Sequence, residues 1–285
     1  MAAMRMIAVF TVSLLSLAFV LDGQQAAKSD PMRPDPEMER PIDALDSVFL
    51  EELTWIEVRD ALRAGKRTVI VATGGIEQNG PYLALGKHNY ILQATTEAIA
   101  RKLGNALVAP IVPFVPEGDI DPPSGHMLYP GSISVREETF RALLTDIAES
   151  LRVHGFHHVL FISDSGGNVT GMKAVAEELG RKWVGSKTTI HYIAEYYDYK
   201  GVGEFLISQG IRQVDEGYHD DVGISSQMMV VDPNTVRMNQ RMAVGKMSIN
   251  GVSLAPPKGV EIGKAVIEYR ANTTVAAAQK AIESQ

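Results

Sequence analysis

One loop of this 285-residue chain combines residue types that could perform hydrolytic chemistry. The stretch "GGIEQNGPYLALGKHN" (residues 74–89) places Glu77 among glycines and a proline, and His88 follows at its end. A carboxylate and an imidazole are ligands for a divalent ion, but the same residues also suit a tight turn whose polar groups satisfy the backbone. The loop alone leaves both interpretations open.

A second glycine pair occurs in "SDSGGN" (residues 163–168), where Asp164 and Ser165 precede the glycines. Asp164 could cap a helix or close a turn instead of doing chemistry. Ser165 is a poor candidate nucleophile, because the G-x-S-x-G elbow needs a glycine where Ser163 stands. The sequence therefore disfavours a serine hydrolase.

Further polar side chains occur in three other stretches, of which "DEGYHDDVG" (residues 215–223) also fits a solvated acidic loop. The candidates in these stretches are Glu117, His126, Tyr196, Tyr197, His219, Asp220 and Asp221. Carboxylates and imidazoles placed at the ends of separate strands are what a hard or borderline divalent ion requires. Such an ion can polarise a carbonyl and make water a nucleophile near neutral pH.

The elements that must position these loops alternate between strand and helix patterns. β-branched apolar runs predict strands, and apolar residues at helical spacing predict helices. The expected strands are 68–75, 106–115, 157–163 and 188–197, and the expected helices are 89–104, 134–155 (with Ser134 as its cap), 171–183 and 273–284. The segment 225–236 fits either a helix or a strand.

This alternation predicts an α/β fold, a three-layer αβα sandwich around a mostly parallel sheet. Both glycine-pair loops follow strands, so they should share the edge of the sheet where the strands' carboxyl ends lie. Ligands bind at that edge in open α/β sheets.

The composition of the chain excludes some classes of function. The chain is 45% hydrophobic and 21% charged, with a formal net charge of −7, and it has no basic run of the kind that binds nucleic acid. We therefore expect no nucleic-acid partner. The chain contains no cysteine, so any metal must be held by nitrogen and oxygen ligands.

The N-terminus has the pattern of a secretory signal. Arg5 precedes an uncharged apolar run at residues 6–21, and small and polar residues follow it. We expect a signal peptide at residues 1–27, a proline- and charge-rich linker at 28–40 and the α/β domain at 41–285. The run is short for a membrane span. The expected location is therefore periplasmic or secreted, with no membrane association after cleavage.

The order of motifs resembles that of the creatininase (creatinine amidohydrolase) family. The matching pieces are "ATGGIEQNGPYLALGKH", the segment from "SGHMLYPGS" to "SDSGGN", and "DEGYHDDVGISSQMMVVDP", which together cover roughly residues 55–237. The resemblance implies an αβα sandwich that assembles into homo-oligomers, usually hexamers. It also implies hydrolysis of cyclic amides or formamides that depends on divalent metal ions.

Several positions depart from the family pattern. Asn79 stands where the family has a metal-binding histidine, His88 where it has a bridging aspartate, and Ser165 where it has a second histidine. His219 matches the family. Because a neutral imidazole offers one lone pair, His88 cannot bridge two ions as a carboxylate does. We therefore expect one divalent ion, zinc or manganese.

The predicted function is hydrolysis of a C–N bond in a small cyclic amide or formamide-like compound. Glu77 and His88 would bind the ion, completed by Asp164 or Asp221, and Glu77 is also assigned a catalytic role. His219 would act as the general acid/base. The substrate would be bound by His126, Tyr196, Tyr197, Asn79 and the backbone of Gly166 and Gly167, which would lie close to the oxyanion.

Two other functions remain open from the sequence. A site with one ion or none could catalyse a lyase or isomerase reaction, with Glu77 and His219 as an acid/base pair. The fold could also serve a periplasmic binding protein without turnover. Metal content and turnover would separate the three.

Overall fold

The structure is a computed structural model, and it describes residues 32–212 and 219–284. The chain divides into two units, residues 1–41 and residues 42–285. The described part of the first unit, residues 32–41, consists of turns and chain without helix or strand. The signal peptide predicted at residues 1–27 lies outside the described residues.

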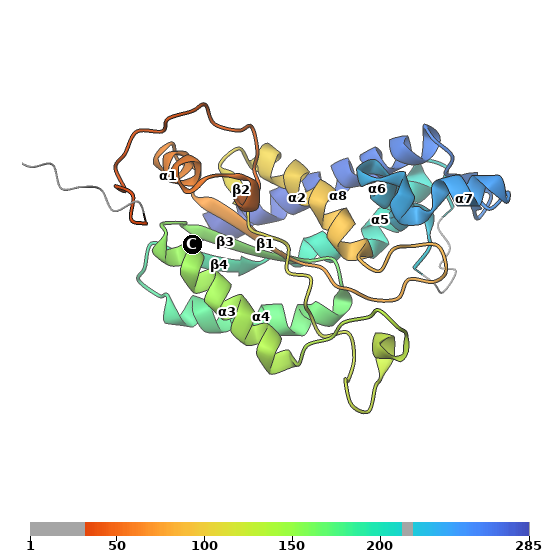
Figure 1. Cartoon of the computed structure of the whole chain (residues 1–285), viewed down its shortest axis with the longest axis horizontal. Coiled ribbons are helices and arrows are strands. Elements are labelled where there is room, and N and C mark those ends of the chain that lie inside the picture. The colour runs from red at the N-terminus through yellow and green to blue at the C-terminus, as the bar shows by residue number, and fades with distance from the viewer. Residues whose placement is uncertain (1–31, 213–218, 285) are drawn as a thin grey trace, which may run out of the picture. The chain divides into compact units, whose positions relative to one another are not determined.

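A parallel sheet forms the centre of the second unit (Figure 1). Among the described residues it has four strands in the order β2-β1-β3-β4. They are β1 (Thr68–Thr73), β2 (Ala106–Val108), β3 (His158–Ser163) and β4 (Thr189–Tyr192). Every residue of β1 is buried, as expected for a strand covered on both faces. β1 and β3 pair along their whole length, from Thr68 opposite His158 to Thr73 opposite Ser163.

Two predicted strands are shorter than expected. The strand predicted at 106–115 ends at Val108. Pro110 and Pro113 follow it, and proline cannot donate a ladder hydrogen bond. The strand predicted at 188–197 ends at Tyr192, and a short 3₁₀ helix at Ala194–Tyr197 follows.

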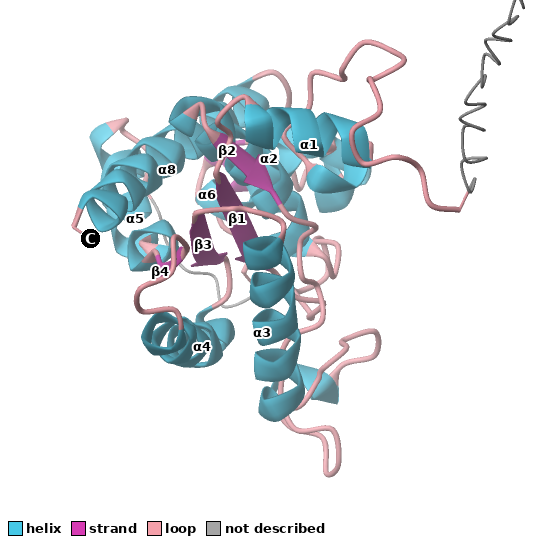
Figure 2. Cartoon of the chain, turned by 90° about the vertical axis from the view of Figure 1, so that its left-hand side faces the viewer, coloured by secondary structure: helices cyan, strands magenta, loops and turns pink. Residues whose placement is uncertain are grey.

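Helices cover both faces of the sheet and confirm the predicted three-layer α/β architecture (Figure 2). Val69 and Val71 pack in one apolar cluster with α3 and α4, whereas Ile70 and Ala72 pack in another with α2 and α8. These helices are α2 (Lys87–Leu103), α3 (Glu137–Val153), α4 (Val169–Lys182) and α8 (Lys258–Glu283). A further helix, α1 (Trp55–Arg63), precedes β1.

Three helix boundaries differ from those predicted. α2 begins at Lys87, two residues before the predicted start at 89, so Lys87 and His88 occupy its first turn. α3 begins at Glu137, and Ser134 does not cap it, because its hydroxyl donates to the carbonyl of Gly118. The closing helix begins at Lys258 instead of 273. This extension brings Arg270 into the helix.

A helical cluster lies at one end of the sheet (Figure 1). It contains α5 (Tyr199–Ser208), α6 (Val222–Val231), α7 (Met238–Ala243) and the first half of α8. The segment predicted as either helix or strand is therefore largely helical. A small antiparallel hairpin of β5 (Ser248–Ile249) and β6 (Val252–Ser253) precedes α8. None of the described helices combines the length and the apolar character needed to cross a membrane.

The topology determines where a ligand site should be. After β1 the chain enters α2 on one face of the sheet, and after β3 it enters α4 on the other. β1 and β3 are neighbours, so their carboxyl ends form a switch point, where ligands bind in open α/β sheets. The two glycine-pair loops begin there.

Candidate functional site

The carboxylate of Glu77 is the centre of the polar cluster at this switch point. Its side chain is only 3% exposed, and nitrogen atoms surround it. Three of them lie close to Oε1: Lys87 Nζ at 2.9 Å, His88 Nε2 at 3.0 Å and His219 Nδ1 at 3.2 Å. The other oxygen, Oε2, lies 3.1 Å from His126 Nε2. The two oxygens of Glu77 therefore face different groups.

The glycine pair before Glu77 lets two side chains approach the backbone. A Cβ at Gly74 would lie 1.9 Å from Oδ1 of Asn89, and that oxygen accepts a hydrogen bond from the N–H of Gly75. A Cβ at Gly75 would lie 2.1 Å from Oε1 of Glu117. Glycine is thus required at both positions so that Asn89 can hold the loop and Glu117 can reach the site.

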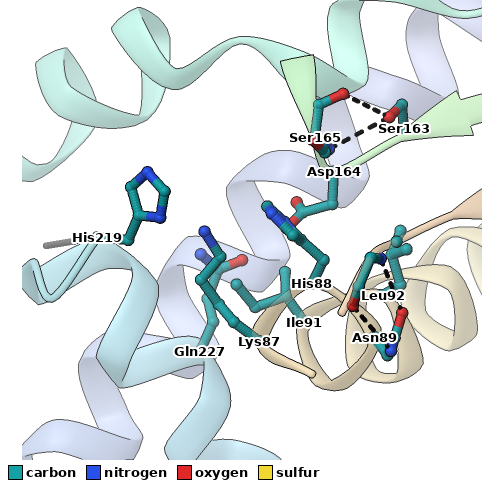
Figure 3. Close-up of polar contacts among 12 residues, drawn as sticks. Lys87, His88, Asn89, Ile91, Leu92, Ser163, Asp164, Ser165, His219 and Gln227 are labelled. Carbon is teal, nitrogen blue, oxygen red and sulfur yellow. Dashed lines mark hydrogen bonds and ion pairs between the residues drawn. The ribbon is translucent and has the colours of Figure 1, made fainter. Parts of the chain in front are cut away.

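The ring of His88 lies beside the carboxylate of Asp164 (Figure 3), and Asp164 in turn forms a buried ion pair with Arg270. Nδ1 of His88 lies 2.8 Å from Oδ2 of Asp164, and Nη2 of Arg270 donates to Oδ1 of Asp164 at 2.7 Å. Burial alone would raise the pKa of Asp164, but the charge of Arg270 and the hydrogen bond from His88 lower it. Asp164 is therefore an ionised anchor for His88 and Arg270.

A second group of side chains is suited to holding a metal ion. Glu77, Glu117 and His126 each offer a ligand atom within 4.8 Å of the others. Oε1 of Glu117 is buried, and no described residue hydrogen-bonds to it, which is costly for a polar atom unless a ligand satisfies it. Two carboxylates and an imidazole form a donor set that fits zinc or manganese. The residues present therefore fit one divalent ion.

Protonation in this group follows from burial and from neighbouring charge. Burial opposes ionisation of Glu77, but hydrogen bonds from His219 and His88 and the charge of Lys87 lower its pKa overall. Burial and the charge of Glu77 raise the pKa of Glu117 to about 9. Burial lowers the pKa of His126, which keeps its ring neutral and able to act as a ligand at neutral pH.

A cavity of about 470 Å³ opens beside Glu77, and this volume suits a small molecule. Its lining includes Ser165, Gly166, Gly167, Tyr197, Tyr199 and Ile224 in addition to the histidines and Lys87. His219 lines it with its ring held at Nδ1, which lies 3.1 Å from Oδ1 of Asn79. Asn79 is itself fixed, because its amide donates to the carbonyl of Glu77.

The structure places the remaining predicted residues in different surroundings. Tyr197 lines the cavity, whereas Tyr196 is buried, with its hydroxyl 2.8 Å from Oγ1 of Thr95. Asp221 also lines the cavity, and its side chain accepts a hydrogen bond from the N–H of Ile224 at the start of α6. His88 has carboxylate oxygens at both ring nitrogens.

Four residues of the site were given no role in the function predicted from the sequence. Glu117 was visible as a carboxylate in a glycine- and proline-rich loop, but nothing in the sequence places it against Gly75. Lys87 could have been found by extending the 89–104 helix by two residues. Arg270 lies in the part of α8 that precedes the predicted start at 273, and Tyr199 belongs to α5, a helix that was not predicted.

The fold and the polar site define a class of α/β hydrolytic proteins, and comparison with known proteins identifies the family. The creatininase family, described as creatinine amidohydrolase, matches residues 51–283. This match covers most of the chain, so the chain belongs to the creatininase family of amidohydrolases. The resemblance recognised in the sequence motifs is confirmed.

Individual relatives are distant. The creatinine amidohydrolase of Pseudomonas putida is 24% identical over 201 residues, which are 68% of this chain and 75% of the relative. The mycofactocin precursor peptide peptidase of Mycobacterium ulcerans is 25% identical over 120 residues, or 39% of this chain and 45% of the peptidase.

Solved structures show the same fold at low sequence identity. A creatininase described with Mn has a TM-score of 0.59 and 20% identity, and the match covers 82% of this chain and 98% of that one. A creatininase mutant described as Zn–Zn type also gives 0.59, at 19% identity and with 83% and 98% covered.

Proposed function

We propose that this chain is a metal-dependent hydrolase that cleaves a C–N bond in a small cyclic amide or formamide-like compound. The observation that supports this most directly is the group formed by Glu77, Glu117 and His126, which lies beside the cavity and includes a buried carboxylate oxygen to which no described residue hydrogen-bonds. A divalent ion held by these three residues would polarise an amide carbonyl and acidify water.

The proposed ligand set differs from the one expected from the sequence because of the contacts just described. Asp164 is fully engaged by His88 and Arg270, and the two nitrogens of His88 face carboxylates. In this proposal His88 and Asp164 orient Glu77, and Asp221 caps α6 at the rim of the cavity.

The other residues of the cavity have separate tasks. Asn79 and Glu77 hold Nδ1 of His219, so Nε2 is the nitrogen with which the ring would pass a proton to the leaving nitrogen. Burial raises the pKa of Tyr197, which keeps its hydroxyl protonated as a donor toward the substrate. The backbone at Gly166 and Gly167 lines the same cavity, where a developing oxyanion would be stabilised.

An isomerase or lyase that uses Glu77 as its base is less well supported. The nitrogen groups around Oε1 lower the pKa of Glu77, so its carboxylate is a weak proton acceptor at neutral pH. A binding protein without turnover would show a bound ion but no hydrolysis.

The test combines ion content with turnover. After loading with zinc or manganese and dialysis, elemental analysis should find bound ion in the wild type and a loss of it in Glu117→Gln. The exposed carboxylate of Glu138 gives a matched control, because Glu138→Gln should keep the ion. His219→Ala should keep the ion and lose turnover of a cyclic-amide panel. Absence of bound ion in the loaded wild type would refute the proposal.

We also propose that the chain is exported to the periplasm or secreted and that it assembles as a homo-oligomer. The apolar run at residues 6–21 supports export, and the family resemblance supports assembly. Cell fractionation with N-terminal mass analysis tests the first, and a full-length cytoplasmic product would contradict it. Sedimentation velocity tests the second, and a monomer at micromolar concentration would contradict it.

A further inference from the structure

The ammonium group of Lys87 is buried inside the polar site. Its side chain is 2% exposed, and its Nζ lies 2.9 Å from Oε1 of Glu77 at the edge of the cavity. Two physical effects oppose a lysine here. Burial of an ammonium group is costly, and the first turn of α2 is the positive end of the helix dipole. Because both effects disfavour a lysine at this position, we expect Lys87 to have a function in the site.

Oε1 of Glu77 has no room for a metal ion beside its present neighbours. A carboxylate oxygen has about two lone-pair positions, and Lys87, His88 and His219 already direct three nitrogens at Oε1. An ion can therefore reach Glu77 through Oε2 alone, on the side of Glu117 and His126.

A carboxylate that joins two ions binds one with each oxygen, and such pairs of ions clamp the two oxygens of a reacting group. At Glu77 the place beside one oxygen is taken by an ammonium group. We propose that Lys87 is the second cation of this site: its fixed charge takes the place of a second metal ion and faces the substrate oxygen. This inference rests on the proposed single-ion hydrolase and assigns a role to a residue that the family resemblance does not explain.

The charges in the site agree with this role. Burial favours the protonated form of Glu117, so a bound divalent ion would displace that proton, and the carboxylates of Glu77 and Glu117 would then balance the charge of the ion. The positive charge of Lys87 is then not balanced by either carboxylate, and Lys87 lines the cavity. An unbalanced positive charge there stabilises an anionic group of the substrate or a developing oxyanion. The same charge repels a nearby ion, so Lys87 should weaken ion binding while it assists turnover.

The decisive variant is Lys87→Met, which keeps most of the length of the unbranched side chain and removes the charge. We expect it to bind zinc at least about tenfold more tightly than the wild type, because the repulsion between like charges is removed. Turnover of the cyclic-amide panel should fall about 100-fold or more, in the range seen when a group that stabilises an oxyanion is removed. Lys87→Arg should restore part of the turnover. Lys102→Met, at the other end of α2, is the matched control and should change neither quantity.

Ion affinity is measured by calorimetry with zinc, and stoichiometry by elemental analysis. Two tightly bound ions per wild-type chain would overturn the role of Lys87 and leave the hydrolase proposal intact. Weaker zinc binding in Lys87→Met, with its circular dichroism spectrum unchanged, would show that the lysine only supports Glu77 and would also overturn it. Absence of any bound ion would instead refute the proposed function. The number of ions bound per wild-type chain is measured without any substitution, so it tests the role of Lys87 even if Lys87→Met fails to fold.

Discussion

The ion pair between Asp164 and Arg270 should be the most sensitive point of the fold outside the apolar clusters. Arg270 lies on α8 and Asp164 lies directly after β3, so the pair joins the last helix to the sheet. Their side chains are 3% and 0% exposed, and the guanidinium carbon also lies 4.2 Å from the ring centre of Tyr196. We predict that Arg270→Met destabilises the protein by about 4 kcal/mol.

This magnitude follows from the contacts that remain. Removing one partner of a buried ion pair costs about 3–5 kcal/mol, because the other charge stays buried without compensation. His88 still donates to Asp164 and limits the loss, whereas the lost contact between the guanidinium and the Tyr196 ring adds to it by about 0.5–2 kcal/mol. The two corrections oppose each other, so the middle of the range is expected.

Urea unfolding followed by circular dichroism measures this free energy. The double variant with Asp164→Asn should be less destabilised than the sum of the single variants by at least about 1.5 kcal/mol, since neither charge is then left alone. Arg181→Met removes an exposed arginine and should stay within about 0.5 kcal/mol of the wild type. If Arg270→Met lost less than about 1 kcal/mol, or the two single effects simply added, the pair would not carry the stability assigned to it.

Three further outcomes are expected. The pKa of Asp164 is lowered in the folded state, so the ionised carboxylate contributes fully to stability above the unfolded pKa of about 3.9, and this contribution is lost as the pH falls below that value. The melting temperature of Asp164→Asn should therefore depend less on pH below about 4 than that of the wild type. Gly75→Ala would place a Cβ 2.1 Å from Oε1 of Glu117, so we expect a loss of about 1–3 kcal/mol in urea unfolding and reduced zinc content. Asp221→Ala removes the cap on the N–H of Ile224 and should cost about 1 kcal/mol with zinc content unchanged; a loss of zinc would make Asp221 a ligand.

The sequence was sufficient to predict the layers of the fold, because buried parallel strands and amphipathic helices have different apolar periods. The run at 68–75 and the helix at 89–104 were recognisable for that reason. Strand ends were less predictable. After Val108, where Pro110 and Pro113 interrupt the run, the described residues form only isolated bridges, and no local pattern shows how much of such a run remains in the sheet.

The site was predictable where its residues lie in one loop and was not predictable where distant segments meet. Glu77 and His88 share a loop and a helix start, so their proximity follows from the local chain. Glu117 reaches the site only because Gly75 has no side chain, and Arg270 reaches it across 106 positions of sequence. Contacts of this kind depend on how the layers pack, and the apolar periodicity of a single segment does not predict that packing.

His88 and Asp164 also show why the departures from the family pattern should be considered together. His88 lies between the carboxylates of Glu77 and Asp164, with a ring nitrogen toward each. A carboxylate at position 88, as in the family pattern, would face both of these anions in a buried space, and each would raise the pKa of the others. The imidazole is therefore compatible with Asp164 in a way that an aspartate is not. Among the described residues, Arg270 pairs with Asp164 and Lys87 lies against Glu77, whereas Oε1 of Glu117, the carboxylate proposed to receive the metal ion, has no hydrogen-bond partner.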